Sequence, residues 1–260
     1  MNLSTRMLVQ TGDNIGIGGF IVTGTAPKHV LIRGVGPTLT KFGITNPLAD
    51  PMLELRGPAP FTSVKNDNWR DTQEAQIKAD GIPPTNDLES AIDATLPAGT
   101  YTVLVTGKGN TSGVALFEVY DLDSAPVSKL GNLSTRASAG TSNNIVIAGF
   151  VLGNNKGTDN VVVRGLGPSL SAFGLPGSSL LADPTLEVRD GDGTLVIADN
   201  DWQDNPAQAA AITAAGLAPS NAKESAVSVP LPAGLYTALL SGTNGGTGIG
   251  LVEVYDRGGP

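Results

Sequence analysis

Apolar and polar residues alternate along most of the chain, and this period of two predicts β-strands. In the segment TYTVLVTG, Tyr101, Val103 and Val105 share one face of an extended chain, opposite Leu104. About eight such runs occur in residues 1–124, separated by clusters of Gly, Pro and Asn. They read NLSTR, NIGIGGFIV, HVLIRGVG, MLELRG, FTSVKND, ESAIDATL, GTYTVLVTG and GVALFEVYD. Regular short strands with such separators are typical of an antiparallel β-sandwich or jelly roll.

One segment in each half of the chain departs from this alternation. Residues 71–81 read DTQEAQIKADG, and residues 205–216 read NPAQAAAITAAG. Both segments are rich in Ala and Gln and end at Gly, which favours a short helix with a glycine stop. We expect this helix to cap an open end of the sandwich.

The same order of elements occurs twice because the chain is a tandem duplication. NLSTR occupies residues 2–6 and again 132–136, an offset of 130. ESAIDATLPAGTYTVLVTG at 89–107 matches ESAVSVPLPAGLYTALLSG at 224–242, so the offset has grown only to 135. The second copy therefore differs in length from the first by only a few small insertions.

The sequence therefore predicts an all-β fold of two tandem antiparallel β-sandwich domains. Each domain is jelly-roll-like, with about eight strands and one short helix. Residues 1–124 form the first repeat and 132–260 the second. Between them, residues 125–131 are a short polar linker that contains Pro126.

Charge and composition narrow the classes of function. The net charge of −8 and the pI of about 4.6, without a cluster of Lys or Arg, argue against a nucleic-acid partner. No apolar run approaches ~18 residues, so we expect no membrane insertion. The absence of Cys excludes disulfides and thiolate metal sites. The start, MNLSTRMLVQ, does not resemble a signal peptide, so we expect either a cytosolic protein or one from which a leader has been removed.

Residues of the catalytic type are few. The single histidine, His29, corresponds to Asn160 in the second copy, and we interpret it as a surface or strand-edge residue. A Ser-His-Asp site would have to lie around His29, and no nucleophile-elbow pattern supports one. The glycine-rich segments GIGGF and GTNGGTGIG lack the lysine of phosphate loops, which favours turns and sheet bends.

Acidic turns provide candidate metal ligands. Ca²⁺ needs several oxygens that converge at about 2.3–2.6 Å, and closely spaced Asp and Asn residues supply them. The alternative, which we favour, is that these side chains form Asx turns at hairpin ends. Calcium is the one cofactor that the sequence suggests. The candidate ligands are Asp183, Asp199, Asp201 and Glu224 in the second copy, and Asp50, Asp67 and Glu89 in the first.

Two tryptophans are candidate ligand-binding residues. Trp69 and Trp202 occupy equivalent positions beside the acidic turns, and an exposed indole there would stack on a sugar ring. The interpretation that we favour is a core residue whose N–H finds a carbonyl.

Arg33 and Arg164 lie within apolar strands, where a guanidinium group needs a carboxylate partner. Asp50 and Asp183, in the repeated LADP motif, are the predicted partners.

Two resemblances follow from the repeated motifs. The segments LADPTLEVRDGDGTLVIADNDW and ESAVSVPLPAGLYTALLSGTNGGTGIGLVEVYD resemble bacterial pre-peptidase C-terminal-like domains over roughly the last two-thirds of each copy. The whole repeat, with NLSTR, GGF and RGLGPSL, resembles tandem modules of large secreted bacterial surface proteins. The resemblance implies secreted, non-catalytic β-sandwich modules, some relatives of which bind calcium or polymeric substrates.

These observations predict a non-enzymatic, extracellular structural module that acts in surface display, adhesion or self-assembly, in a filament or surface layer. Its expected partners are copies of itself, joined through edge strands, or neighbouring modules of a longer protein. The alternative is a carbohydrate- or polymer-binding accessory module of a secreted enzyme. A hydrolase is a third hypothesis, which the scarcity of catalytic-type residues disfavours.

Overall fold

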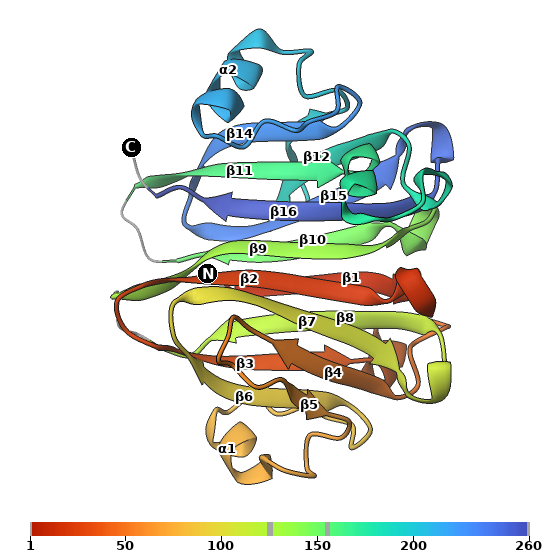
Figure 1. The fold of residues 1–260 in the computed structure, drawn as a ribbon, viewed down its shortest axis with the longest axis vertical. Coiled ribbons are helices and arrows are strands. Elements are labelled where there is room, and N and C mark those ends of the chain that lie inside the picture. The colour runs from red at the N-terminus through yellow and green to blue at the C-terminus, as the bar shows by residue number, and fades with distance from the viewer. Residues whose placement is uncertain (1, 124–126, 154–156, 259–260) are drawn as a thin grey trace. The chain divides into compact units, whose positions relative to one another are not determined.

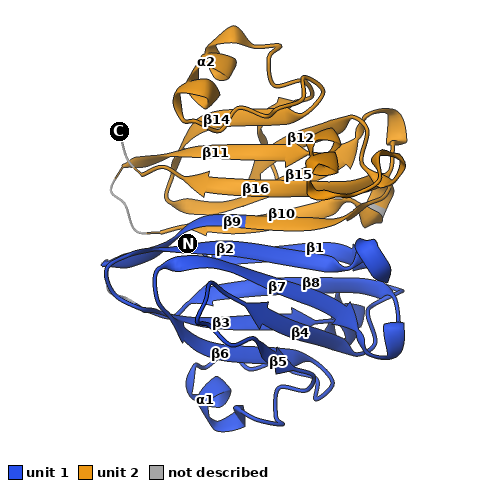
Figure 2. Cartoon of the chain, viewed as in Figure 1, with its two compact units in different colours: residues 1–133 blue, residues 134–260 orange. Residues whose placement is uncertain are grey.

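The computed structural model describes residues 2–123, 127–153 and 157–258 (Figure 1). The chain divides into two compact units, unit 1 (residues 1–133) and unit 2 (residues 134–260) (Figure 2). About half of the described residues lie in β-strands, and the strand pairs within each unit run antiparallel, which confirms the all-β prediction. No helix within the described ranges is long and apolar enough to cross a membrane.

The strands follow the predicted runs closely. Those of unit 1 are β1 (Asn2–Val9), β2 (Gly16–Gly24), β3 (Lys28–Val35), β4 (Pro51–Arg56), β5 (Val64–Asn66), β6 (Ser90–Leu96), β7 (Gly99–Gly107) and β8 (Gly113–Asp121). Strand β9 (Ser128–Ala139) contains the boundary between the units. Unit 2 continues with β10 (Val146–Leu152), β11 (Thr158–Leu166), β12 (Pro184–Asp190), β13 (Leu195–Asp199), β14 (Ser225–Pro232), β15 (Gly234–Gly242) and β16 (Gly248–Asp256).

Each unit contains two sets of four hydrogen-bonded strands, which we call ladders, and the strand order is the same in both units. Unit 1 has the ladders β1-β8-β3-β6 and β2-β7-β4-β5. Unit 2 has β9-β16-β11-β14 and β10-β15-β12-β13. Consecutive strands therefore alternate between the two ladders, except for the hairpins β4–β5 and β12–β13.

The two ladders of unit 1 pack face to face. A Cβ atom placed on Gly18 of β2 would lie 2.0 Å from the ring of Phe117 on β8. A Cβ atom placed on Gly34 of β3 would lie 3.1 Å from a methyl carbon of Leu53 on β4. Such close approaches mean that side chains of one ladder reach the backbone of the other, so the two ladders share one packed core.

The boundary between the units differs from the predicted linker. Residues 128–131 form the start of β9, and the boundary follows Leu133. Thr23 at the end of β2 donates its hydroxyl hydrogen to the carbonyl of Lys129 at 3.3 Å. Ser128 and Leu130 are buried and Lys129 between them is exposed, which is the alternation of a strand. The polar composition of this segment had favoured a linker instead. Pro126 lies outside the described residues.

Helices α1 (Glu74–Ala79) and α2 (Pro206–Ala214) occur where the sequence predicts them, but α1 does not cap an open end. Ile77 of α1 is buried against Leu31 of β3 and Ala91 of β6. Leu31 lies on the face of β3 opposite Gly34, because alternate residues of a strand point to opposite faces. Since Gly34 faces the second ladder, α1 covers the outer face of the first.

The contact between Gly18 and Phe117 generates a stability prediction, because unit 2 has Ala148 and Val252 at the corresponding positions. We expect Gly18→Ala to destabilise the chain by about 1–3 kcal/mol through overpacking. The double variant with Phe117→Val should lose less stability than the sum of the two single variants, as urea denaturation would measure. Strictly additive losses would contradict this packing.

Candidate functional site

The two glutamates among the predicted calcium ligands are buried and bind backbone groups. Glu224 accepts hydrogen bonds through Oε1 from the N–H groups of Gly167 at 3.0 Å and Ser169 at 2.8 Å. Glu89 holds the corresponding loop of unit 1 in the same way. Each carboxylate therefore fixes the RGxGP loop that follows the third strand of its unit.

Asp50 and Asp67 of unit 1 lie together, and a lysine accompanies them. Nζ of Lys108 is 2.6 Å from Oδ2 of Asp67 and 3.7 Å from Oδ2 of Asp50. Partial burial, and then the neighbouring carboxylate of Asp67, raise the pKa of Asp50. The ammonium group of Lys108 thus lies where a calcium ion bound to these two carboxylates would supply its positive charge.

In unit 2, Thr243 occupies the position of Lys108, so a hydroxyl group replaces the ammonium group. Oγ1 of Thr243 lies 3.1 Å from Oδ1 of Asp183 and 2.7 Å from Oδ1 of Asn200. Nζ of Lys223 lies 3.7 Å from Oδ2 of Asp183. This arrangement brings one carboxylate and two neutral oxygens together.

The remaining candidate ligands form no group of three with Asp183 among the described residues. Asp199 accepts a hydrogen bond from the N–H of Ala226 at 2.9 Å, which ties β13 to β14, and burial raises its pKa. Over the described part of the chain, no three of the predicted ligands bring carboxylate oxygens within 4.8 Å of one another. Asp201 therefore lies outside any such group, and calcium binding at these turns stays a prediction.

The two tryptophans make the same hydrogen bond, from their ring N–H to a backbone carbonyl. Trp69 donates to Asn86 and Trp202 donates to Asn221, each at 3.2 Å. Trp69 is only 2% exposed and packs with Ile77 of α1 against the outer face of the first ladder. Trp202 is half-buried.

The two indole rings differ in what covers them. The guanidinium carbon of Arg70 lies 4.1 Å from the ring centre of Trp69, and Nζ of Lys78 lies 6.0 Å from it. Unit 2 has Gln203 and Thr213 at these two positions. Both line an open groove of about 620 Å³ beside Trp202.

This groove is mostly apolar. It lies along α2, whose exposed face carries alanines where α1 carries charged residues. Its walls include the indole of Trp202 together with Pro206 and Ala210. A half-buried indole that lines an open groove is a platform on which a flat apolar surface can stack.

Arg33 pairs with Glu118 and not with Asp50 as predicted. Nε of Arg33 donates to Oε2 of Glu118 at 2.8 Å, and the Tyr120 hydroxyl donates to Oε1 at 2.7 Å. Arg33 and Glu118 are direct cross-strand neighbours on β3 and β8. Burial, and then the charge of Glu118, raise the pKa of Tyr120 to about 12.

Unit 2 repeats this arrangement. Arg164 pairs with Glu253 instead of the predicted Asp183, and Tyr255 completes the group. The predicted aspartates lie beyond the ends of the strands, whereas the motif EVYD places Glu and Tyr on the strand beside the arginine.

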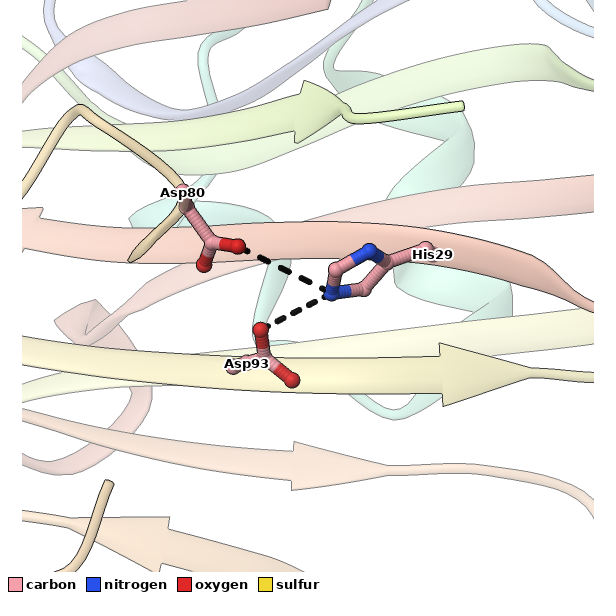
Figure 3. Close-up of side chains that lie close together, drawn as sticks. All are labelled: His29, Asp80 and Asp93. Atoms are coloured by element: carbon pink, nitrogen blue, oxygen red, sulfur yellow. Dashed lines mark hydrogen bonds and ion pairs between the residues drawn. The ribbon is translucent and has the colours of Figure 1, made fainter. Parts of the chain in front are cut away.

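His29 lies in a cluster that the sequence analysis did not identify (Figure 3). It is not on an edge strand, because β3 pairs with both β6 and β8. Its Nε2 is 2.8 Å from Oδ2 of Asp93 on β6 and 4.0 Å from Oδ1 of Asp80, which follows α1. The hydrogen bond with Asp93 raises the pKa of His29, and burial raises the pKa of Asp80.

The comparisons with known proteins identify no family. A scan of protein-family models and a search of curated proteins find no match to this chain. Among solved structures, the crystal structure of the STIV MCP is 11% identical, with a TM-score of 0.25, over 96% of this chain and 95% of that chain. The atomic structure of Sulfolobus Turreted Icosahedral Virus is 10% identical, with a TM-score of 0.24, over 98% and 88%. A likeness at such TM-scores carries no argument about function.

Because different side chains pack on the indole rings of Trp69 and Trp202, the two residues should differ in fluorescence quenching. In single-tryptophan variants, Trp202 should be quenched by acrylamide several-fold more strongly than Trp69, because no cationic side chain of the described residues stacks on it. Phenylalanine would replace the other tryptophan in each variant, and circular dichroism would verify that both remain folded. Equal quenching constants would contradict the difference in cover.

Proposed function

We propose that the chain is a non-enzymatic structural module that assembles with copies of itself. The observation that carries the proposal is the exposed apolar edge strand β13. Strand β13 ends its ladder in the described structure, with β12 as its hydrogen-bonded neighbour. Leu195 and Val196 on this strand are 49% and 39% exposed. An edge strand presents unpaired N–H and C=O groups, and apolar side chains beside them favour pairing with another chain.

The corresponding edge of unit 1 is shorter and carries a charge, although Val64 on it is 37% exposed. Strand β5 is only three residues long and carries Lys65, whose Nζ lies 3.2 Å from Glu54. Short edge strands with charged side chains discourage edge-to-edge pairing. The contrast between β5 and β13 supports assembly through unit 2.

A further apolar side chain extends the exposed edge. Leu235, at the start of β15, is 61% exposed. It lies beside the turn between β12 and β13, since a Cβ atom placed on Gly191 would be 3.3 Å from Cβ of Leu235. Contiguous exposed apolar residues are typical of interaction surfaces.

We assign each unit to the jelly-roll type of β-sandwich. The orders β1-β8-β3-β6 and β2-β7-β4-β5 are those of an eight-stranded jelly roll, in which Greek keys connect two sheets. This fold type is frequent in assembling and in ligand-binding proteins, so it supports the proposal without selecting it.

The proposed setting is extracellular, in a filament or surface layer, with surface display or adhesion as the role of the assembly. Support for this setting comes from the resemblance of the whole repeat to modules of secreted bacterial surface proteins. Neighbouring modules of a longer protein are the other proposed partners.

The assembly proposal predicts a selective effect of lysine at the exposed edge. Leu195→Lys with Val196→Lys should abolish concentration-dependent association, because charged side chains cannot be buried at a strand-to-strand contact. The matched control is Thr62→Lys with Ser63→Lys, at the corresponding positions of unit 1. Sedimentation velocity and electron microscopy would measure association. An assembly that survives the first change, or a wild-type chain that stays monomeric at high concentration, would refute the proposal.

The second candidate function is binding of a carbohydrate or another polymer in the groove at Trp202. The observation that favours it is that the indole of Trp202 lines the groove, whereas the equivalent ring of Trp69 is covered by Arg70. Apolar faces of sugar rings stack on such exposed aromatic rings.

This candidate predicts that the groove can be closed without removing the tryptophan. Gln203→Arg with Thr213→Lys copies the cover of unit 1 and should abolish retention on insoluble polysaccharides such as cellulose, chitin or xylan. Trp202→Ala should have the same effect. The control is Lys223→Ala, at an exposed side chain outside the groove. No retention of the wild-type chain on any of these polymers would exclude this function for them.

A further inference from the structure

We propose that His29, Asp80 and Asp93 form a binding site for a divalent transition-metal ion in unit 1. The site lies on the outer face of the first ladder of unit 1, whereas the exposed edge strand β13 and the groove at Trp202 belong to unit 2. It is therefore independent of the proposed assembly.

The donor atoms suit such an ion in kind and in spacing. One imidazole nitrogen and two carboxylate oxygens all lie within 4.8 Å of one another. Two ligands about 2.1 Å from one ion lie roughly 3 to 4 Å apart, close to the separations of 2.8 Å and 4.0 Å from Nε2 of His29. The His29 side chain is 34% exposed, so solvent reaches the site and water can complete the coordination.

An unsatisfied buried oxygen provides independent support for a ligand. The Asp80 side chain is only 9% exposed, and its Oδ2 has no hydrogen-bond partner among the described residues. A buried carboxylate oxygen without a partner is costly. A cation between Asp80, Asp93 and His29 would compensate both carboxylates.

The surrounding structure holds the three ligands in place. The Gln73 side chain donates to the carbonyl of Asp93 at 2.8 Å and accepts from its N–H at 3.2 Å. The N–H of His29 donates to Oδ2 of Asp123 at 2.8 Å. Backbone positions fixed in this way reduce the reorganisation that metal binding requires.

Unit 2 keeps this framework without the ligands. Gln208, the counterpart of Gln73, accepts a hydrogen bond from the N–H of Ser228 at 2.7 Å. The three ligand positions are occupied by Asn160, Ala215 and Ser228. The fold of a unit therefore does not require His29, Asp80 or Asp93, and the three donors occur together in unit 1.

The ligand set indicates which ions to test. An imidazole nitrogen favours Zn²⁺ and other transition metals over Ca²⁺, which prefers oxygen ligands. The chain has no cysteine, and His29 is its single histidine, so an imidazole ligand can come from this position alone. Zn²⁺ is therefore the appropriate probe, with Ca²⁺ as the comparison.

The test is titration of the full chain, without a histidine tag, with ZnCl₂ in an isothermal calorimeter. We expect one Zn²⁺ per chain and no comparable binding of Ca²⁺. His29→Asn and Asp93→Ser, which install the residues of unit 2, should each weaken binding by at least about tenfold. Asp87→Asn, at a 72% exposed side chain outside the site, should leave binding unchanged.

A direct readout separates ligation from a merely structural hydrogen bond. Long-range ¹H–¹⁵N spectra should show a single histidine whose Nε2 resonance shifts on addition of one equivalent of Zn²⁺. If the folded wild-type chain binds no Zn²⁺, or if His29→Asn binds it equally well, the proposal is overturned. A loss of thermal stability in His29→Asn without any metal binding would assign the cluster a structural role only.

Discussion

A sheet that is apolar on both faces has to be covered on both, and this requirement organises each unit. In unit 1 the ladder β1-β8-β3-β6 meets the second ladder on its inner face, where Gly34 approaches Leu53. Its outer face carries Leu31, which is fully buried. The segment between β5 and β6 supplies this outer cover through Trp69 and Ile77. Without that segment, apolar surface would face water.

The outer cover also positions the candidate chemistry. Asp80 follows the helix of the cover, and His29 and Asp93 lie on the strands beneath it. In unit 2 the corresponding segment leaves Trp202 half-buried, in the lining of an open groove beside an alanine-rich helix. A duplicated chain can vary one cover while the other remains intact, because each ladder pair is packed within its own unit.

Local features of the chain could be predicted from the sequence, and contacts between distant segments could not. Alternation located the strands, and the Ala/Gln-rich runs located the helices, because both patterns depend on neighbours in sequence. The partner of Arg33 depended on the register between β3 and β8, so Glu118 was missed. Asp80 and Asp93 were missed for the same reason, since they come from separate elements. The sequence did contain one indication of this cluster: the second copy has a different residue from the first at all three of its positions.

The Arg–Glu–Tyr groups on the outer faces have a consequence for alkaline solutions. The pKa values of Tyr120 and Tyr255 are raised to about 12 from an ordinary value of 10.0, chiefly by burial. These phenols favour the folded chain fully below pH 10. Between pH 10 and about 12 the unfolded chain releases protons that the folded chain retains, so this contribution is lost. Strong base should therefore loosen both units through the same pair of hydroxyl groups, one in each copy.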